Sequence, residues 1–187
     1  MDKKLDAALC KKYPKIFEQR DGDPTSTLMG WGFEHGDGWY NIIDGMCSLM
    51  QGHIDASIKS NNEVNEHNLM LDDASKGKWR RFNKKYKSFL PTDPFRIAAK
   101  QKIIDQYETH KTVEYRIVPP VCKQIVALQV KEKFGTLRFY HHGGDTFTDG
   151  VAAMAEAMSA RTCEECGNPG KIAAGCWLRC LCDKHQI

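Results

Sequence analysis

The sequence predicts an α+β fold in which helices pack on a small sheet, with a compact cysteine-rich module at the C-terminal end. Apolar residues recur at three- and four-residue steps in several segments, which is typical of amphipathic helices. Other segments alternate polar and apolar residues with the period of a half-buried strand. Five of the eight cysteines lie within residues 163–182. We therefore expect a core domain over residues 1–160 and a small module over residues 161–187.

The composition excludes several classes of protein. With 187 residues, of which 41% are hydrophobic, the chain can bury a core and is not intrinsically disordered. Its net charge of +3 excludes a polyanionic DNA mimic but does not by itself indicate nucleic-acid binding. No apolar run approaches the roughly 18 residues that span a membrane, so we expect no membrane partner. The charged first residues lack the apolar run of a secretory signal, which predicts an intracellular protein.

The first half of the core domain is predicted to be helical. A short helix over residues 5–12 ends before Pro14, which cannot continue it. A longer helix begins at Trp39 with Asp37 as its cap, because apolar residues recur at helical spacing as far as Ile58. Residues 60–92 are polar and then basic, and we expect them to form a surface excursion from the core.

A third helix and a strand are predicted in the middle of the chain. Asp93 and Pro94 have the pattern of an N-cap and a first helical residue, so this helix should run to about Tyr107. Alternation of apolar and polar residues predicts a strand over residues 113–117. The prolines that follow it would end the strand.

The last part of the core domain contains one ambiguous segment. Residues 121–134 fit a buried helix or a strand, and we favour a helix because Gly135 suits a helix C-cap. A strand over residues 136–140 and a solvated loop over residues 141–145 follow. A final amphipathic helix then leads directly to Cys163.

The C-terminal cysteines have the spacing of metal ligands. Cys163 and Cys166 form a CxxC motif followed by glycine, and Cys182 and His185 form a CxxH motif. Two intervening residues let both side chains of a pair reach the same ion. Two short strands are predicted between the pairs, over residues 171–175 and 177–178, so the layout is that of a zinc ribbon or treble clef.

These four residues predict one structural Zn²⁺ site. Three thiolates and one imidazole complete a tetrahedral ligand set and leave no position for a substrate. The alternative is a group of reduced cysteines that pack as small hydrophobic residues. Cys176 and Cys180 are interpreted as spectators, with Cys180 the better substitute for a ligand.

A glycine-rich loop before the long helix is a candidate ligand site. It combines aromatic and ionisable residues within a short stretch: Trp31, Glu34, His35, Asp37 and Trp39. Such a set could bind a small ligand, or act with a second metal in a hydrolase. The alternative is a tight turn whose glycines allow a bend and whose aromatic side chains pack on the core.

A basic segment is a candidate nucleic-acid interface. Its basic residues include Lys78, Arg80, Arg81, Lys84 and Lys85. Aromatic residues at positions 79, 82 and 86 would share one helical face and leave the charges exposed to phosphates. The alternative is that these aromatic residues only anchor a solvated helix to the core.

Several stretches resemble a family of small, mostly uncharacterised tailed-bacteriophage and prophage proteins. The similar stretches cover residues 13–17, 31–40, 130–140, 163–170 and 181–185. The most distinctive are the sequence Lys-Glu-Lys-Phe-Gly-Thr-Leu-Arg-Phe-Tyr at 131–140 and the C-terminal CxxCG and CxxH motifs. The resemblance extends over residues 13–58 and 118–187, and it implies the same four zinc ligands.

The resemblance implies an origin more than an activity, since small phage proteins often act on host components. Our leading hypothesis is a non-enzymatic, zinc-stabilised accessory protein in the host cytoplasm. It would bind a host protein or a nucleotide-like ligand in host takeover or counter-defence. The alternatives are a nucleic-acid-binding protein that uses residues 76–87, and a metal-dependent hydrolase that uses Glu34, His35 and Asp37.

Overall fold

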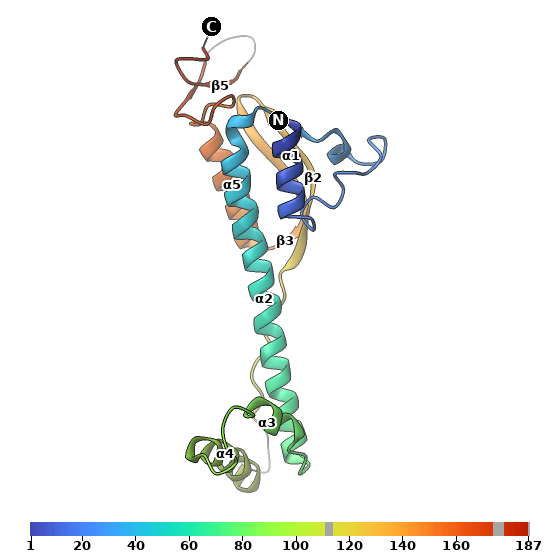
Figure 1. Cartoon of the computed structure of the whole chain (residues 1–187), viewed down its shortest axis with the longest axis vertical. Helices are drawn as coiled ribbons and strands as arrows, with labels where there is room; N and C mark the ends of the chain where they lie inside the picture. The colour runs from blue at the N-terminus through green and yellow to red at the C-terminus, as the bar shows by residue number, and fades with distance from the viewer. Residues whose placement is uncertain (111–113, 174–177, 187) are drawn as a thin grey trace. The chain divides into compact units, whose positions relative to one another are not determined.

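The computed structural model describes residues 1–110, 114–173 and 178–186 (Figure 1). The α+β class is confirmed, because α-helices accompany a three-stranded mixed sheet and a two-stranded sheet. The chain forms two compact units: a core unit of residues 1–56 and 122–187, and a middle unit of residues 57–121. This division differs from the predicted one, which separates residues 1–160 from residues 161–187.

In its described residues, the core unit contains all or part of three α-helices: α1 (Lys3–Lys12), the first half of α2 (Tyr40–Ser75) and α5 (Thr146–Ser159). The predicted helix over residues 5–12 is confirmed as α1, which Asp2 caps. Two short 3₁₀ turns, η1 (Leu28–Trp31) and η2 (Asp37–Trp39), precede α2. Asp37, predicted to cap the long helix, is the first residue of η2, and its carboxylate accepts a hydrogen bond from the Asp2 N–H.

The three-stranded sheet has β2 (Lys123–Lys133) at its centre. The short strand β1 (Phe33–Glu34) runs parallel to β2, and β3 (Thr136–Gly144) pairs antiparallel with it. Helix α5 packs along β3. Side chains of α5 also accept hydrogen bonds from backbone N–H groups of β3, at Leu137 and Phe139. This contact covers an otherwise unpaired strand edge.

The favoured helix over residues 121–134 is wrong, because most of this segment is β2. Two register shifts interrupt the pairing with β3, so the buried residues Ile125, Val126 and Ala127 follow one another without alternation. Phe134 and Gly135 both have positive φ, 56° and 78°, as a two-residue hairpin turn requires. The end of a helix also favours a residue with left-handed backbone. Gly135 alone therefore does not distinguish a helix that ends there from a hairpin turn.

Three other segments differ from their predicted structure. Residues 114–117 of the predicted strand have no regular structure, and residue 113 lies outside the described part of the chain. The predicted loop over 141–145 is wrong, because β3 extends through the histidines to Gly144. The long helix, predicted as far as Ile58, extends further, because residues 60–75 of the expected excursion continue α2.

The core lies between the sheet and the helices of the core unit. Its fully buried side chains include Met29, Trp39, Ile43, Val130 and Leu137. Each contributes on the order of 1.5–3 kcal/mol through removal of apolar surface from water. Met29 and Trp39, at the two ends of the glycine-rich loop, both belong to the larger hydrophobic cluster of the described residues.

The middle unit contains the end of α2 together with α3 (Arg80–Lys85) and α4 (Pro94–His110). The predicted start of α4 is confirmed, since Asp93 accepts a hydrogen bond from the Phe95 N–H. A small cluster of Met70, Leu71 and Phe82 holds the unit together, with Trp79 and Tyr86 packed against it. None of the described helices is both long enough and apolar enough to cross a bilayer.

Candidate metal centre and anion-binding pocket

The four residues predicted as metal ligands lie together in the core unit. The ligand atoms of Cys163, Cys166, Cys182 and His185 are all within 4.8 Å of one another. His185 Nδ1 lies 3.5 Å from Cys163 Sγ and 3.3 Å from Cys182 Sγ, and the sulfurs of Cys166 and Cys182 are 3.7 Å apart. These residues could hold a metal ion.

The spacing of the ligand atoms can be compared with that around a tetrahedral ion. Zinc–sulfur bonds of about 2.3 Å and zinc–nitrogen bonds of about 2.0–2.1 Å give sulfur–sulfur edges of about 3.8 Å and sulfur–nitrogen edges of about 3.6 Å. The observed separations of 3.3–3.7 Å are within a few tenths of an ångström of these edges. These three separations therefore fit the edges of a tetrahedral site.

Two local turns bring the ligands together. In the first, the Gly167 N–H donates to the Cys163 carbonyl at 2.9 Å, and Gly167 has a φ of 75° that favours glycine. In the second, the His185 N–H donates to the Cys182 carbonyl at 2.9 Å. The strands β4 (Lys171–Ile172) and β5 (Cys180–Leu181) pair between the two turns.

Of the other two C-terminal cysteines, Cys180 is described by the structure and does not join this group. Cys180 is fully buried in the hydrophobic core, where burial raises the pKa of its thiol. Cys176 lies outside the described residues, as do parts of both predicted strands of the module. The interpretation of Cys180 as a spectator therefore agrees with its position.

Backbone N–H groups favour the thiolate form of Cys163. Burial opposes ionisation of this thiol, but hydrogen bonds from the N–H groups of Cys182, Cys166 and Glu165 outweigh it. Together with His185 they lower the pKa of Cys163 to about 6. Such donors are the usual supporting contacts of a thiolate ligand.

The glycine-rich loop holds the metal-ligand turn against the core. The Gly38 N–H donates to the Glu164 carbonyl at 2.7 Å, and the Gly36 N–H donates to the Glu164 carboxylate at 2.9 Å. The buried Trp39 indole donates to the Thr162 carbonyl at 2.8 Å. The loop residues thus act as a seat for the cysteine-rich module.

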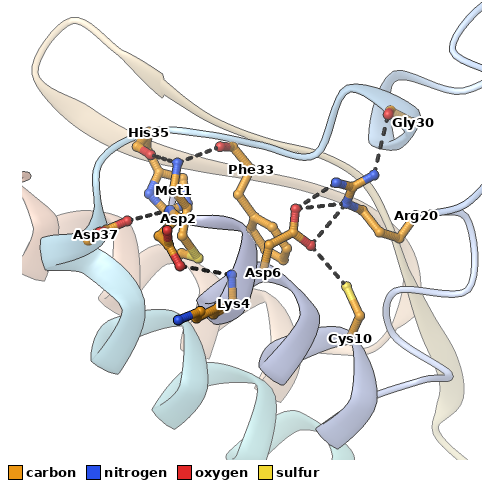
Figure 2. Close-up of polar contacts among 10 residues, drawn as sticks. All are labelled: Met1, Asp2, Lys4, Asp6, Cys10, Arg20, Gly30, Phe33, His35 and Asp37. Carbon is orange, nitrogen blue, oxygen red and sulfur yellow. Dashed lines mark hydrogen bonds and ion pairs between the residues drawn. The ribbon is translucent and has the colours of Figure 1, made fainter.

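The same loop is also tied to the N-terminal segment (Figure 2). The Met1 amino group donates to the carbonyl oxygens of Phe33, at 3.2 Å, and of His35. The Asp2 N–H donates to the Asp37 carboxylate at 2.6 Å. The carboxylate of Asp37 is therefore engaged by the backbone of the N-terminal segment.

A second anchor in Figure 2 is the ion pair of Asp6 and Arg20, whose shortest nitrogen–oxygen distance is 2.6 Å. The Arg20 guanidinium also donates to the Gly30 carbonyl at 3.4 Å, which fixes the start of the loop. The Cys10 thiol donates to Asp6 at 3.5 Å. Burial and the Asp6 carboxylate raise the pKa of Cys10 to about 12, so this thiol stays protonated.

The predicted ligand-binding residues of the loop do not converge on one point. Trp31 is 67% exposed, whereas Trp39 is completely buried. Glu34 accepts a hydrogen bond from the Gln129 amide at 2.9 Å. Burial lowers the pKa of His35 to about 4, so its ring is neutral. In the described part of the chain, Glu34, His35 and Asp37 form no cluster that could hold a metal ion.

The middle unit contains a pocket of about 580 Å³ that is rich in charge. Four cationic side chains and two carboxylates line it, together with His67: Arg81, Lys84, Lys85, Arg116, Glu63 and Glu66. The lining therefore carries a surplus of two positive charges with His67 neutral. The volume falls in the range of small-molecule sites, roughly 300–1,000 Å³.

Secondary structure and one backbone clamp position the cationic groups. Arg81 donates to Asp73 at 2.9 Å and to Glu66 at 3.2 Å. The backbone of Arg116 is held on α2, because the Asn68 amide both donates to its carbonyl and accepts from its N–H. The clamp leaves the Arg116 guanidinium available to the pocket.

Like charges are crowded in this pocket. The Lys85 ammonium lies 3.2 Å from His67 Nδ1. Burial, with the nearby charges of Lys85 and Arg116, lowers the pKa of His67. Burial and the Arg116 charge also lower the pKa of Lys85. A bound anion would relieve this repulsion.

The pocket includes some of the predicted nucleic-acid-binding residues and excludes others. Arg81, Lys84 and Lys85 line it, whereas Lys78 and Arg80 are exposed outside it. Sequence reasoning missed His67, which lies in the polar part of α2, and it placed Arg116 in a strand. Only their basic character was visible in the sequence.

Comparisons of the chain with family models, curated proteins and solved structures give no match. Membership of the bacteriophage family thus stays a prediction from the sequence motifs. Function has to be inferred from the geometry of the metal-ligand cluster and of the pocket.

Proposed function

We propose that this protein is a non-enzymatic binding protein whose middle unit takes up a phosphate-bearing, nucleotide-like ligand. The observation that carries the proposal is the pocket in which four cationic side chains and His67 face only two carboxylates. Arginine and lysine side chains together recognise phosphate through charge-assisted hydrogen bonds. Arg116 and Lys85 would contact the phosphate, while Arg81 is already held by acidic neighbours.

The pocket gains from an anion in a second way. In the free protein, Lys85 donates to His67 Nδ1, and both groups have lowered pKa values. A phosphate would accept from both side chains and favour protonated His67. Binding should therefore take up a proton, and affinity should rise as the pH falls toward the ordinary range of histidine.

We propose that the C-terminal cluster holds one structural Zn²⁺. Three thiolates and an imidazole are a zinc ligand set, and a site closed by four protein ligands stabilises a fold instead of binding substrate. The ion would link the turn at Cys163 to the turn at Cys182, in a segment that has little apolar core of its own. The zinc has no part in ligand binding under this proposal.

From the resemblance to bacteriophage proteins, we propose the host cytoplasm as the location of the ligand and host takeover or counter-defence as the context. A host protein as the partner stays a prediction. A nucleic-acid interface is the second candidate, because Lys78 and Arg80 extend the positive charge beyond the pocket. The hydrolase hypothesis has less support, since its three residues do not converge.

Calorimetric titration of ATP into the full chain tests the proposal. Arg116→Ala should weaken binding about tenfold or more, because a hydrogen bond to a charged group contributes about 1.5–3 kcal/mol. The backbone clamp to Asn68 does not depend on the Arg116 side chain, so the variant should fold. Arg80→Ala is the matched control, because it removes the same charge outside the pocket.

Two results would contradict the proposal. Absence of saturable ATP binding would contradict the claim that the pocket takes up a nucleotide-like ligand. Equal weakening by Arg80→Ala and Arg116→Ala, together with tighter binding of an oligonucleotide than of ATP, would favour the nucleic-acid interface instead.

A further inference from the structure

A second group of potential metal ligands lies in the core unit, with no residue in common with the C-terminal cluster. It consists of His53 on α2, Cys122 before β2 and Asp145 at the start of α5. One ligand atom from each lies within 4.8 Å of the other two. The His53 Nε2 and Asp145 Oδ2 atoms are 2.7 Å apart.

The sheet register explains why two distant parts of the sequence meet here. Lys123 of β2 pairs with Gly144 of β3, at the ends of both strands. The residues just outside this pair, Cys122 and Asp145, are therefore brought side by side. His53 reaches the same point from α2, where its ring lies 4.4 Å from the Phe147 ring.

We propose that His53, Cys122 and Asp145 form a second divalent-metal site, selective for zinc-like ions and open at one coordination position. Imidazole, thiolate and carboxylate are the three side-chain groups that zinc takes in proteins, and three protein ligands with a fourth open position are typical of accessible zinc sites. Hard cations such as Mg²⁺ prefer oxygen ligands alone. The mixed donor set therefore selects a borderline ion.

The carboxylate is already oriented for this role. Asp145 Oδ1 accepts hydrogen bonds from the N–H groups of Phe147 and Thr148, at 3.1 and 3.2 Å, in a capping box. These bonds leave Oδ2 directed at His53. Such outer contacts hold metal ligands in position.

This site is partly exposed to solvent, as the C-terminal one also is, but it has three potential ligands instead of four. Cys122 is buried, whereas the side chains of His53 and Asp145 are 32% and 39% exposed. One side is thus accessible to an entering ion and to water. The His53–Asp145 pair must open by a few tenths of an ångström, because ligand atoms around zinc are more than about 3 Å apart. We therefore expect a weaker, exchangeable ion here.

Equilibrium dialysis of the full chain against Zn²⁺, followed by metal analysis, tests the site. Wild type should hold one zinc that resists a mild chelator and a second that the chelator removes. Asp145→Asn should lose the second zinc only, because asparagine caps a helix about as well as aspartate. His53→Gln should give the same loss.

Matched controls separate a built site from unspecific binding. Cys10→Ser and His142→Asn change one cysteine and one histidine outside the group, and both should keep the second zinc. Cys163→Ser should lose the chelator-resistant zinc and keep the exchangeable one. A wild type that takes up one zinc only, or an Asp145→Asn variant that still takes up two, would overturn the proposal. Neither outcome depends on ATP binding in the middle unit.

Discussion

Substitution of Gly38 by alanine tests the close contact between the glycine-rich loop and the metal-ligand turn at Cys163. A Cβ atom at this position would lie 2.1 Å from the Cys163 carbonyl oxygen and 2.4 Å from the Gly167 backbone nitrogen. Real Cβ atoms do not approach backbone so closely, so the turn must move away from the core. That movement would break the hydrogen bonds from Gly38 to Glu164 and from Trp39 to Thr162.

The expected loss follows from these contacts. Two hydrogen bonds contribute about 1 kcal/mol each, and overpacking costs about 1–3 kcal/mol. Gly38→Ala should therefore lower the free energy of unfolding by about 3–5 kcal/mol. Urea unfolding followed by circular dichroism measures it. Metal content should stay at one tightly held ion, because all four ligands are unchanged.

Gly45→Ala is the matched control, because no atom lies within 4 Å of a Cβ at this helical position. Replacement of an exposed helical glycine should stabilise the protein by about 0.5–1 kcal/mol. A Gly38→Ala protein as stable as wild type would refute the idea that the close approach of Gly38 to the Cys163 turn stabilises the fold. If both variants lose the same free energy of unfolding, the loss comes from replacing any glycine by alanine and not from the contact at Gly38.

Three further predictions concern metal and pH. Cys163→Ser and His185→Ala should each lower metal content and melting temperature together, and unchanged metal content in both would make the ligand assignment wrong. Burial holds the pKa of His35 at about 4, below its ordinary value of 6.5, so the unfolded chain takes up this proton first. Stability should therefore fall as the pH drops from 6.5 to 4, by up to about 3 kcal/mol, and urea unfolding of His35→Asn should show a smaller fall. ATP affinity measured by calorimetry should rise between pH 8 and pH 6 in wild type, because His67 gains a proton on binding, and should stay flat in His67→Asn.

The C-terminal ligands were predictable because their geometry is local. A CxxC or CxxH motif places both ligands of a pair within one turn, so spacing alone indicates the site. The Cys180 thiol shows the limit of that reasoning, since only the packing of the core decides that it joins the buried apolar side chains and not the ligand group. The sequence could therefore rank Cys180 but not exclude it.

Sites that depend on tertiary contacts were beyond the sequence. Cys122 and Asp145 meet only through the register of β2 and β3. The helix that the sequence favours over residues 121–134 contains no such strand pairing. The two shifts in that register remove the alternation that identifies a strand. Without the hairpin, no pattern connects residues 122 and 145.

For the glycine-rich loop, the sequence predicts the turn and its packing but not its packing partner. Its glycines indicated a tight turn, and its aromatic residues indicated packing on the core. The partner in that packing is the backbone of Cys163 and Glu164, more than a hundred residues away. Close approach between distant backbones leaves no local pattern beyond the glycines themselves.

Native mass spectrometry of the freshly purified full chain, with and without ATP, tests the central claim most directly. We expect one zinc that survives mild chelation. We also expect a single ATP adduct that forms equally in wild type and Arg80→Ala and needs about tenfold more ATP, or more still, in Arg116→Ala. A chain that holds this zinc but gains no ATP adduct would contradict the binding function. An Arg116→Ala chain that gains ATP as readily as wild type would contradict the assignment of the pocket.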